Sequence, residues 1–188
     1  MRELCLIVQT SLDGFVAGAD GAFTNFVEGE ENLAFVCSIT DEADAALFGR
    51  VSFQLLNSHW PRAGSEPGAS ENAIKYSNWY NAVPKYVLSK SLEIKDPNTV
   101  VISEDIETQI LDIKKQPGKS ILIFGSPTAV QSLLDLKLLD SFWMIVHPVM
   151  FGQGIPFFRE RKDIIKLELI ASKQLANGTL CQKYLLSK

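Results

Sequence analysis

Residues 121–158, ILIFGSPTAVQSLLDLKLLDSFWMIVHPVMFGQGIPFF, are the stretch from which the fold can be deduced. They begin with an apolar run, Ile121–Phe124, which is too short for a helix and is followed by Gly125, a pattern typical of a buried strand. Pro127 suits the first position of a helix, and the apolar run Phe142–Met150 predicts another strand. The stretch therefore predicts a strand, a tight turn, a helix and a strand in succession, which is the unit of an α/β protein.

The tight turn has the composition of a phosphate site. Gly125 lets a ligand approach the backbone, Ser126 and Thr128 are good N-cap residues, and Pro127 begins the helix. The unpaired N–H groups and the dipole of a helix N-terminus favour an anion at this place. Short turns of this kind are also common as ordinary connections, so that alternative stays open here.

A similar pattern of apolar segment, glycine and helix occurs earlier, at residues 44–56. Gly49 precedes a predicted helix whose first turn carries Arg50 and Ser52. These residues could bind an anion through a charge-assisted hydrogen bond, a hydroxyl and backbone amides. Two such turns suggest either two phosphates or one pyrophosphate held from both sides. The alternative for Arg50 is a solvated surface arginine.

A third polar segment follows the predicted strand Tyr86–Leu88. Ser89 and Lys90 come directly after this strand. An open α/β sheet binds its ligands beyond the carboxyl ends of its strands, where this lysine could reach a phosphate. The alternative is an ordinary polar loop.

The two ends of the chain add further elements. The run Leu4–Val8 predicts a first strand, which leads to the turn at Asp13. Asp13 is either a carboxylate beside a cleft or a side chain that caps its own turn. Near the other end, Asn177-Gly178 lies between apolar segments at 164–171 and 180–186, which predicts an antiparallel hairpin.

The remaining segments follow from periodicity and turn residues. Apolar spacing predicts helices over residues 28–39, 69–83 and 106–116 and a strand over residues 99–103. Residues 60–70 are rich in Pro, Gly and Ser, which predicts a surface loop.

The composition indicates one ordinary globular domain over residues 1–188. The chain is 46% hydrophobic and 21% charged, with a net charge of −4 and no dense Lys/Arg block, so we expect no nucleic-acid partner. No apolar run is long enough to span a bilayer or to act as a signal peptide, so we expect no membrane partner and a cytoplasmic location. Cys5, Cys37 and Cys181 lie in apolar surroundings and are predicted to be reduced core residues.

Several familiar motifs are excluded. His59 and His147 have no Cys or His spacing that makes a zinc site, so we expect no metal. Gly118-Lys119-Ser120 resembles the end of a P-loop, but Ile113 occupies the position of the required upstream glycine. A Gly-x-Ser-x-Gly nucleophile elbow is also missing from the sequence.

Five segments together resemble the bacterial riboflavin-biosynthesis reductase domain and its stand-alone relatives, which belong to the dihydrofolate-reductase-like superfamily. They span nearly the whole chain, in the right order: Ser11–Gly14, Gly49-Arg50 with Ser52, Tyr86–Lys90, Ile121–Pro127, and Leu139-Asp140 leading to His147–Gly152. The resemblance implies a single-domain dihydrofolate-reductase-like fold with three αβα layers. Its central sheet would be mixed and mostly parallel, with the antiparallel hairpin at the C-terminus.

The resemblance also implies that NADPH lies across the strand ends. Gly49, Arg50 and Ser52 match positions that grip the phosphates of the cofactor in that family. Ser89 and Lys90 match positions near the adenosine ribose phosphate.

The other matched positions complete the implied site. Gly125, Ser126, Pro127 and Thr128 would meet the pyrophosphate. Asp13 would lie near the nicotinamide and the substrate, as a polar contact or a proton relay.

The implied activity is hydride transfer to a C=N or C=O carbon of a small heterocyclic or sugar-derived substrate. The models for it are 5-amino-6-(5-phosphoribosylamino)uracil reductase, which acts in riboflavin biosynthesis, and dihydrofolate reductase. A homodimer is the usual assembly in this family, so we expect one here.

Some departures from the family favour an alternative. The family usually has a Gly-Gly pair where this chain has Gly125-Ser126, and Phe26 stands where relatives often have tryptophan. The acid of the folate reductases could be replaced only by Glu28, Glu30 or Glu31. The alternative function is therefore a non-catalytic nucleotide-binding or regulatory module on the same fold.

Overall fold

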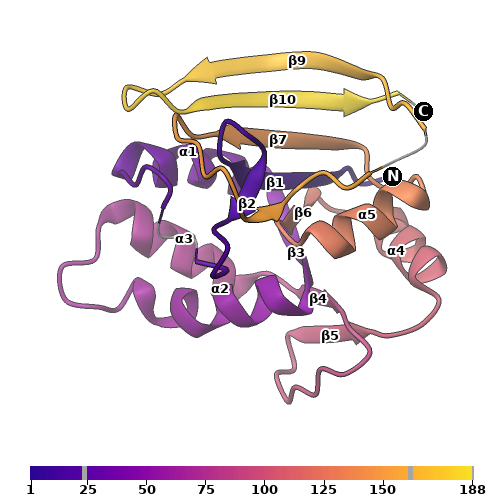
Figure 1. Cartoon of the computed structure of the whole chain (residues 1–188). Coiled ribbons are helices and arrows are strands. Elements are labelled where there is room, and N and C mark those ends of the chain that lie inside the picture. The colour runs from indigo at the N-terminus through magenta and orange to yellow at the C-terminus, as the bar shows by residue number, and fades with distance from the viewer. Residues whose placement is uncertain (23–24, 161–162, 188) are drawn as a thin grey trace.

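The computed structural model describes residues 1–22, 25–160 and 163–187. A mixed sheet of eight strands forms the centre, in the order β5-β4-β3-β6-β1-β7-β10-β9 (Figure 1). The strands from β5 to β7 run parallel, whereas β10 is antiparallel to β7 and β9 is antiparallel to β10. The predicted α/β class, the mostly parallel sheet and the antiparallel C-terminal strands are therefore confirmed.

The elements have the following bounds. Across the sheet, the strands are β5 (Thr99–Ile102), β4 (Lys85–Leu88), β3 (Ala43–Gly49), β6 (Ser120–Phe124), β1 (Leu4–Thr10), β7 (Ser141–Val146), β10 (Leu180–Leu186) and β9 (Leu167–Gln174). A separate antiparallel ribbon joins β2 (Phe15–Ala17) to β8 (Ile155–Pro156). The helices are α1 (Glu30–Thr40), α2 (Arg50–Ala63), α3 (Glu71–Ala82), α4 (Ile106–Lys115) and α5 (Pro127–Asp135).

Helices bury both faces of the parallel part of the sheet, which gives the predicted three layers (Figure 1). On one face, α4 and α5 belong to a core that includes Leu133 and the β1 residue Leu6. On the other face, α1, α2 and α3 belong to a core that includes Tyr80 and the β1 residue Ile7. Alternate residues of β1 thus serve opposite cores, as the period of a strand requires.

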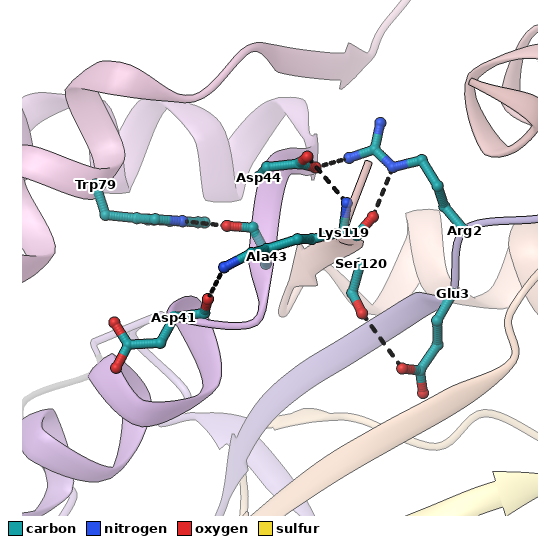
Figure 2. Close-up of polar contacts among 8 residues, drawn as sticks. All are labelled: Arg2, Glu3, Asp41, Ala43, Asp44, Trp79, Lys119 and Ser120. Atoms are coloured by element: carbon teal, nitrogen blue, oxygen red, sulfur yellow. Dashed lines mark hydrogen bonds and ion pairs between the residues drawn. The ribbon is translucent and has the colours of Figure 1, made fainter. Parts of the chain in front are cut away.

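A polar network connects the N-terminus to the amino ends of neighbouring strands (Figure 2). Arg2 forms an ion pair with Asp44 of β3, and its Nε donates to the Lys119 carbonyl at 2.6 Å. The Lys119 amide donates to Asp44 at 2.9 Å, and Ser120 donates to Glu3 at 3.3 Å. These bonds tie β1, β3 and β6 together at the edge where the parallel strands begin.

A buried ion pair strengthens the same region. Lys114, at the end of α4, places its Nζ 2.5 Å from Asp140 Oδ2 and 2.8 Å from the Leu138 carbonyl, and its side chain is 4% exposed. The Leu4 amide donates to the same Asp140 oxygen at 2.8 Å. The pair therefore joins α4, β1 and the segment before β7.

Three predicted boundaries were wrong. The helix α2 continues through Pro61 to Ala63, so only the part of residues 60–70 after Ala63 is a connection. The strand β7 ends at Val146 instead of Met150, where the chain continues into His147-Pro148 and a proline cannot donate to a ladder. The strand β9 begins at Leu167, three residues after the predicted start of the hairpin.

Other features of the chain agree with the sequence or add to it. The three cysteines are buried and free, and burial raises the pKa values of the Cys5 and Cys181 thiols to about 11, so they stay protonated at neutral pH. Among the helices described, none has the length and apolar character needed to cross a membrane. The edge strand β9 exposes Leu167, Leu169 and Ile170, but the expected homodimer stays a prediction.

Replacing Lys114 by methionine should destabilise the protein by about 3 kcal/mol, because Asp140 would lose its buried cation. The measurement is urea unfolding followed by circular dichroism. Lys115→Met is the matched control, since Lys115 is the next residue, is 63% exposed and pairs with Asp112 on the surface. We expect the control to change the free energy of unfolding by less than about 1 kcal/mol. Equal effects of the two substitutions would contradict a stabilising role for the buried pair.

Candidate functional site

A large cavity lies beyond the carboxyl ends of the parallel strands. Its volume is about 1490 Å³, whereas roughly 300–1,000 Å³ is usual for one small ligand, so it has room for two ligands. The lining includes every residue that the sequence predicted to bind the cofactor: Gly49, Arg50, Ser52, Ser89, Lys90, Gly125, Ser126, Pro127 and Thr128. The structure therefore brings the three predicted polar segments together, although their role as ligands stays a prediction.

The two glycine turns lie against each other. In the register of β3 and β6, Leu47 is opposite Ile123, so Gly49 and Gly125 follow at the same level of the sheet. A Cβ on Gly49 would overlap the Ser126 hydroxyl and lie 3.0 Å from the Ser126 Cβ. A Cβ on Gly125 would lie 3.7 Å from the Ser52 hydroxyl. The turns are thus close enough to hold the two phosphates of one pyrophosphate.

Both helices that begin at these turns lack a side-chain cap. The N-cap residue of α2 is Gly49, which has no side chain to accept from the first turn of α2. Ser126 occupies the N-cap position of α5 with a left-handed backbone (φ 58°), and its side chain makes no capping bond. The predicted capping by Ser126 was therefore wrong, because capping needs an extended residue there. The first-turn amides of both helices remain available to an anion.

Cationic side chains surround the turns. Arg50 and Lys90 are exposed and line the cavity. Arg159 lines it too, and its Nη2 donates to the Thr128 hydroxyl at 2.9 Å. Arg159 was missed by the sequence analysis, since it follows β8 far along the chain and no motif contains it. With three cations and two uncapped helix ends, this part of the cavity fits a phosphate-rich nucleotide such as NADPH.

The opposite side of the cavity is apolar and aromatic. Its walls come from α1, α2, α3 and the segment before α1, and they include Val36, Trp60, Tyr76 and Phe26. We call this part the aromatic lobe. Trp60 lies at the end of a helix whose continuation through Pro61 the sequence did not predict, whereas Phe26 had been noted only as a departure from the family. An aromatic lobe suits a planar organic molecule.

The three glutamates considered as acids differ in their surroundings. Glu31 accepts hydrogen bonds from the amides of Ala176 and Asn177 at 2.8 and 2.7 Å and does not line the cavity. Glu30 lines the cavity, but a hydrogen bond from Asn72 at 3.0 Å lowers the pKa of its carboxyl. Glu28 also lines the cavity, so it is the carboxylate best placed to act on a ligand.

Asp13 lies outside the lining of the cavity. Its carboxylate accepts from the Ser11 hydroxyl at 2.6 Å and from the amides of Phe151 and Gly152 at 3.1 and 2.7 Å. The pKa of Asp13 is lowered mainly by the hydrogen bond from Ser11, and the hydrogen bonds from the two amides lower it further. The geometry thus makes Asp13 a tie between the first turn and the loop after β7, while its catalytic role stays a prediction.

His147 is buried behind the cavity and was not singled out as a site residue. Its Nε2 lies 2.9 Å from the Oε1 of Gln9, and its ring centroid lies 4.6 Å from that of Phe26. The side chain is 1% exposed, and burial lowers the pKa of His147 to about 4, with the backbone of Val27 acting weakly in the opposite direction. The imidazole is therefore neutral at pH 7.

The stability of the protein should fall on acidification partly because of His147. Its pKa is about 4 in the folded state and about 6.5 in an unfolded chain, so between these values the unfolded state binds more protons. The contribution of neutral His147 to the free energy of unfolding is therefore complete above pH 6.5. Up to about 3 kcal/mol of this contribution is lost as the pH falls to 4. Urea unfolding at pH 7.5 and pH 4.5 measures how much the free energy of unfolding falls between the two pH values. This fall should be smaller for His147→Phe than for the wild type. His59→Gln, at an exposed histidine, is the matched control. An unchanged loss in His147→Phe would contradict the prediction.

The contact between the turns predicts a coupled pair of substitutions. Gly49→Ala should destabilise the protein by about 2 kcal/mol, because its Cβ would overlap Ser126. In a Ser126→Gly background the same change should cost much less, since the overlap with the Ser126 side chain is removed and the Ala129 Cβ lies 3.2 Å away. Thermal unfolding of the single and double variants gives the coupling energy. Additive effects would show that the two turns do not constrain each other.

Comparisons with known proteins agree with this geometry. Residues 2–181 match the family model described as RibD C-terminal domain. The uncharacterized protein YyaP of Bacillus subtilis (strain 168) is 27% identical over 179 residues, which cover 95% of this chain and 92% of that protein.

Solved structures show the same fold. A putative riboflavin biosynthesis protein from Shewanella sp. PV-4 is 18% identical, with a TM-score of 0.76 and full coverage of both chains. The dihydrofolate reductase of Enterococcus faecalis, solved with NADP(H), is 15% identical, with a TM-score of 0.65 over 99% of this chain and 97% of that one. The fold is thus dihydrofolate-reductase-like, and the chain belongs to the family of the RibD C-terminal domain.

Proposed function

We propose that this protein is an NADPH-dependent reductase of a small heterocyclic or sugar-derived substrate. The observation that carries the proposal is the shared cavity, in which two uncapped helix N-termini and three cationic side chains lie on one side and an aromatic lobe on the other. One side has the chemistry for phosphates, and the other has the shape and polarity for a planar acceptor.

Within the proposed reaction, bound NADPH would supply the hydride, and the chain would bind, orient and shield the reactants. Arg50, Ser52 and Lys90 would hold phosphates, with the first-turn amides of α2 and α5. The aromatic lobe would seat the substrate and exclude water. Glu28 would supply the proton, directly or through a water molecule, and Asp13 would position the loop after β7.

The substrate would accept the hydride at a C=N or C=O carbon. The family membership supports substrates related to that of 5-amino-6-(5-phosphoribosylamino)uracil reductase or to a dihydropterin. A non-catalytic nucleotide-binding module is the alternative. Ser126 supports it, because a residue that carries a side chain, with a left-handed backbone, occupies the turn that would meet the pyrophosphate. Turnover of any pterin, pyrimidine or iminium compound would exclude the alternative.

The cofactor can be tested by thermal shift with NADPH and NADH in parallel. A ligand that binds the folded state stabilises it by about 2.7 kcal/mol when its concentration is 100 times the dissociation constant. This stabilisation raises the melting temperature. We expect a clear rise with NADPH and a smaller one with NADH, because Lys90 and Ser89 would contact the additional phosphate. No rise with either dinucleotide would refute the proposed function.

Arg50→Ala should weaken NADPH binding by about 1 to 3 kcal/mol, the range for losing a hydrogen bond to a charged group. Isothermal titration calorimetry measures the dissociation constant. Arg62→Ala is the matched control, since Arg62 is exposed near the other end of the same helix and outside the lining of the cavity. An unchanged dissociation constant in Arg50→Ala would remove Arg50 from the cofactor site.

A further inference from the structure

Gln9 is an unusual residue in the floor of the cavity. Among the described strand residues that line the cavity, it is the only one with a polar side chain: the others are Ile7, Val8, Val16, Ala17, Gly49, Leu88, Ile102, Phe124, Ile145, Ile155 and Pro156. The other residues of β1 are buried, whereas Gln9 is exposed to the cavity. A polar group at this place avoids a desolvation penalty only if water or a ligand forms hydrogen bonds with it.

The orientation of the Gln9 amide is set from behind by His147. The Nε2 of His147 lies 2.9 Å from Gln9 Oε1, and because an amide oxygen only accepts hydrogen bonds, this placement of the amide pairs with the tautomer that carries the proton on Nε2. Nδ1 makes no hydrogen bond of normal distance and angle within the described part of the chain. With its oxygen held by His147, the amide has its NH₂ group left for the cavity.

The imidazole itself is fixed by packing. Phe26 lies against it, with ring centroids 4.6 Å apart, and Phe26 in turn lies 5.2 Å from Phe151. The His147 amide also donates to the Thr10 carbonyl at 2.8 Å. These contacts fix the position of the ring, so that Nε2 stays directed at the Gln9 amide.

Two neighbouring polar side chains of the aromatic lobe, Asn32 and Glu30, already have protein partners. The Asn32 amide nitrogen donates to Thr179 at 3.3 Å, and its oxygen accepts from Asn177. Glu30 accepts from Asn72. Gln9 thus offers a hydrogen-bond donor to a ligand at a place where the protein has fixed its direction.

We infer that Gln9 selects ligands with a carbonyl-type acceptor at the inner end of the aromatic lobe, and that His147 is a positioning residue that holds the Gln9 amide in the donating orientation. The inference deepens the proposed function, because it takes the aromatic lobe as the substrate side of the cavity. A site built to donate a hydrogen bond rejects an analogue that presents a donor, since both groups would then stay unpaired.

The test uses two probes of nearly the same shape, pterin and diaminopteridine, which differ by a ring carbonyl or an amino group at one position. Their dissociation constants are measured by calorimetry on the chain with and without NADP⁺. We expect the wild type to bind pterin about tenfold more tightly, the ratio that corresponds to one hydrogen bond of roughly 1.4 kcal/mol. Equal affinity, a preference for diaminopteridine or no binding of pterin would each overturn the inference.

Substitutions separate the roles of the two residues. Gln9→Leu should abolish the preference, and Gln9→Glu should reverse it, because a carboxylate only accepts. His147→Phe should reduce the preference while NADP⁺ binding is kept, since Gln9 could then rotate. Gln174→Leu, on the edge strand β9 and outside the cavity lining, is the matched control and should keep the preference. A preference that survives in Gln9→Leu would overturn the inference.

A measurement on the wild type covers the case in which His147→Phe does not fold. In a nitrogen-15 spectrum, the side-chain amide signals of Gln9, assigned by their loss in Gln9→Glu, should move on adding pterin. Unmoved signals at saturating pterin would overturn the inference. Failure of NADPH to bind would instead refute the proposed function alone, because the probe pair also tests Gln9 in the cofactor-free chain.

Discussion

The parallel pairing of β3 with β6 is the constraint on which the candidate site depends. It sets two strand ends at the same level of the sheet, so that the turns at Gly49 and Gly125 touch and the helices α2 and α5 begin side by side. Neither turn alone differs from an ordinary connection between a strand and a helix. Their contact creates a local field from two helix N-termini, to which Arg50 and Arg159 add positive charge.

The amino ends and the carboxyl ends of the parallel strands have opposite properties. At the amino ends, the network around Arg2, Asp44 and Glu3 pairs polar groups with protein partners (Figure 2). The Lys114–Asp140 pair does the same nearby. At the carboxyl ends, the helix N-termini carry no side-chain caps, and Gln9 turns its amide to a cavity. The polar contacts at the amino ends stabilise the fold. The carboxyl ends leave hydrogen-bond donors for a ligand, as is general for open parallel sheets.

Two departures from the expected family pattern, Ser126 and Phe26, lie at the carboxyl ends of the strands. Ser126, at the position where the resemblance predicts a glycine, has a left-handed backbone and lies against Gly49. Phe26 packs on His147 and lines the aromatic lobe. Both departures therefore lie in the lining of the cavity, where members of one fold family can differ without a change of fold.

The sequence by itself determined the α/β class, most strands and helices, and the three polar segments that the structure places around one cavity. These features depend on local patterns: apolar runs, glycine at turns and residues suited to helix starts. Tertiary structure alone decided where α2 ends, that Asp13 is not part of the cavity lining, that Gln9 and Arg159 line the cavity, and that His147 contacts Gln9. The physical reason is that these properties arise from contacts between residues far apart in the chain, such as Gln9 with His147 and Arg159 with Thr128, and no local pattern encodes such a contact.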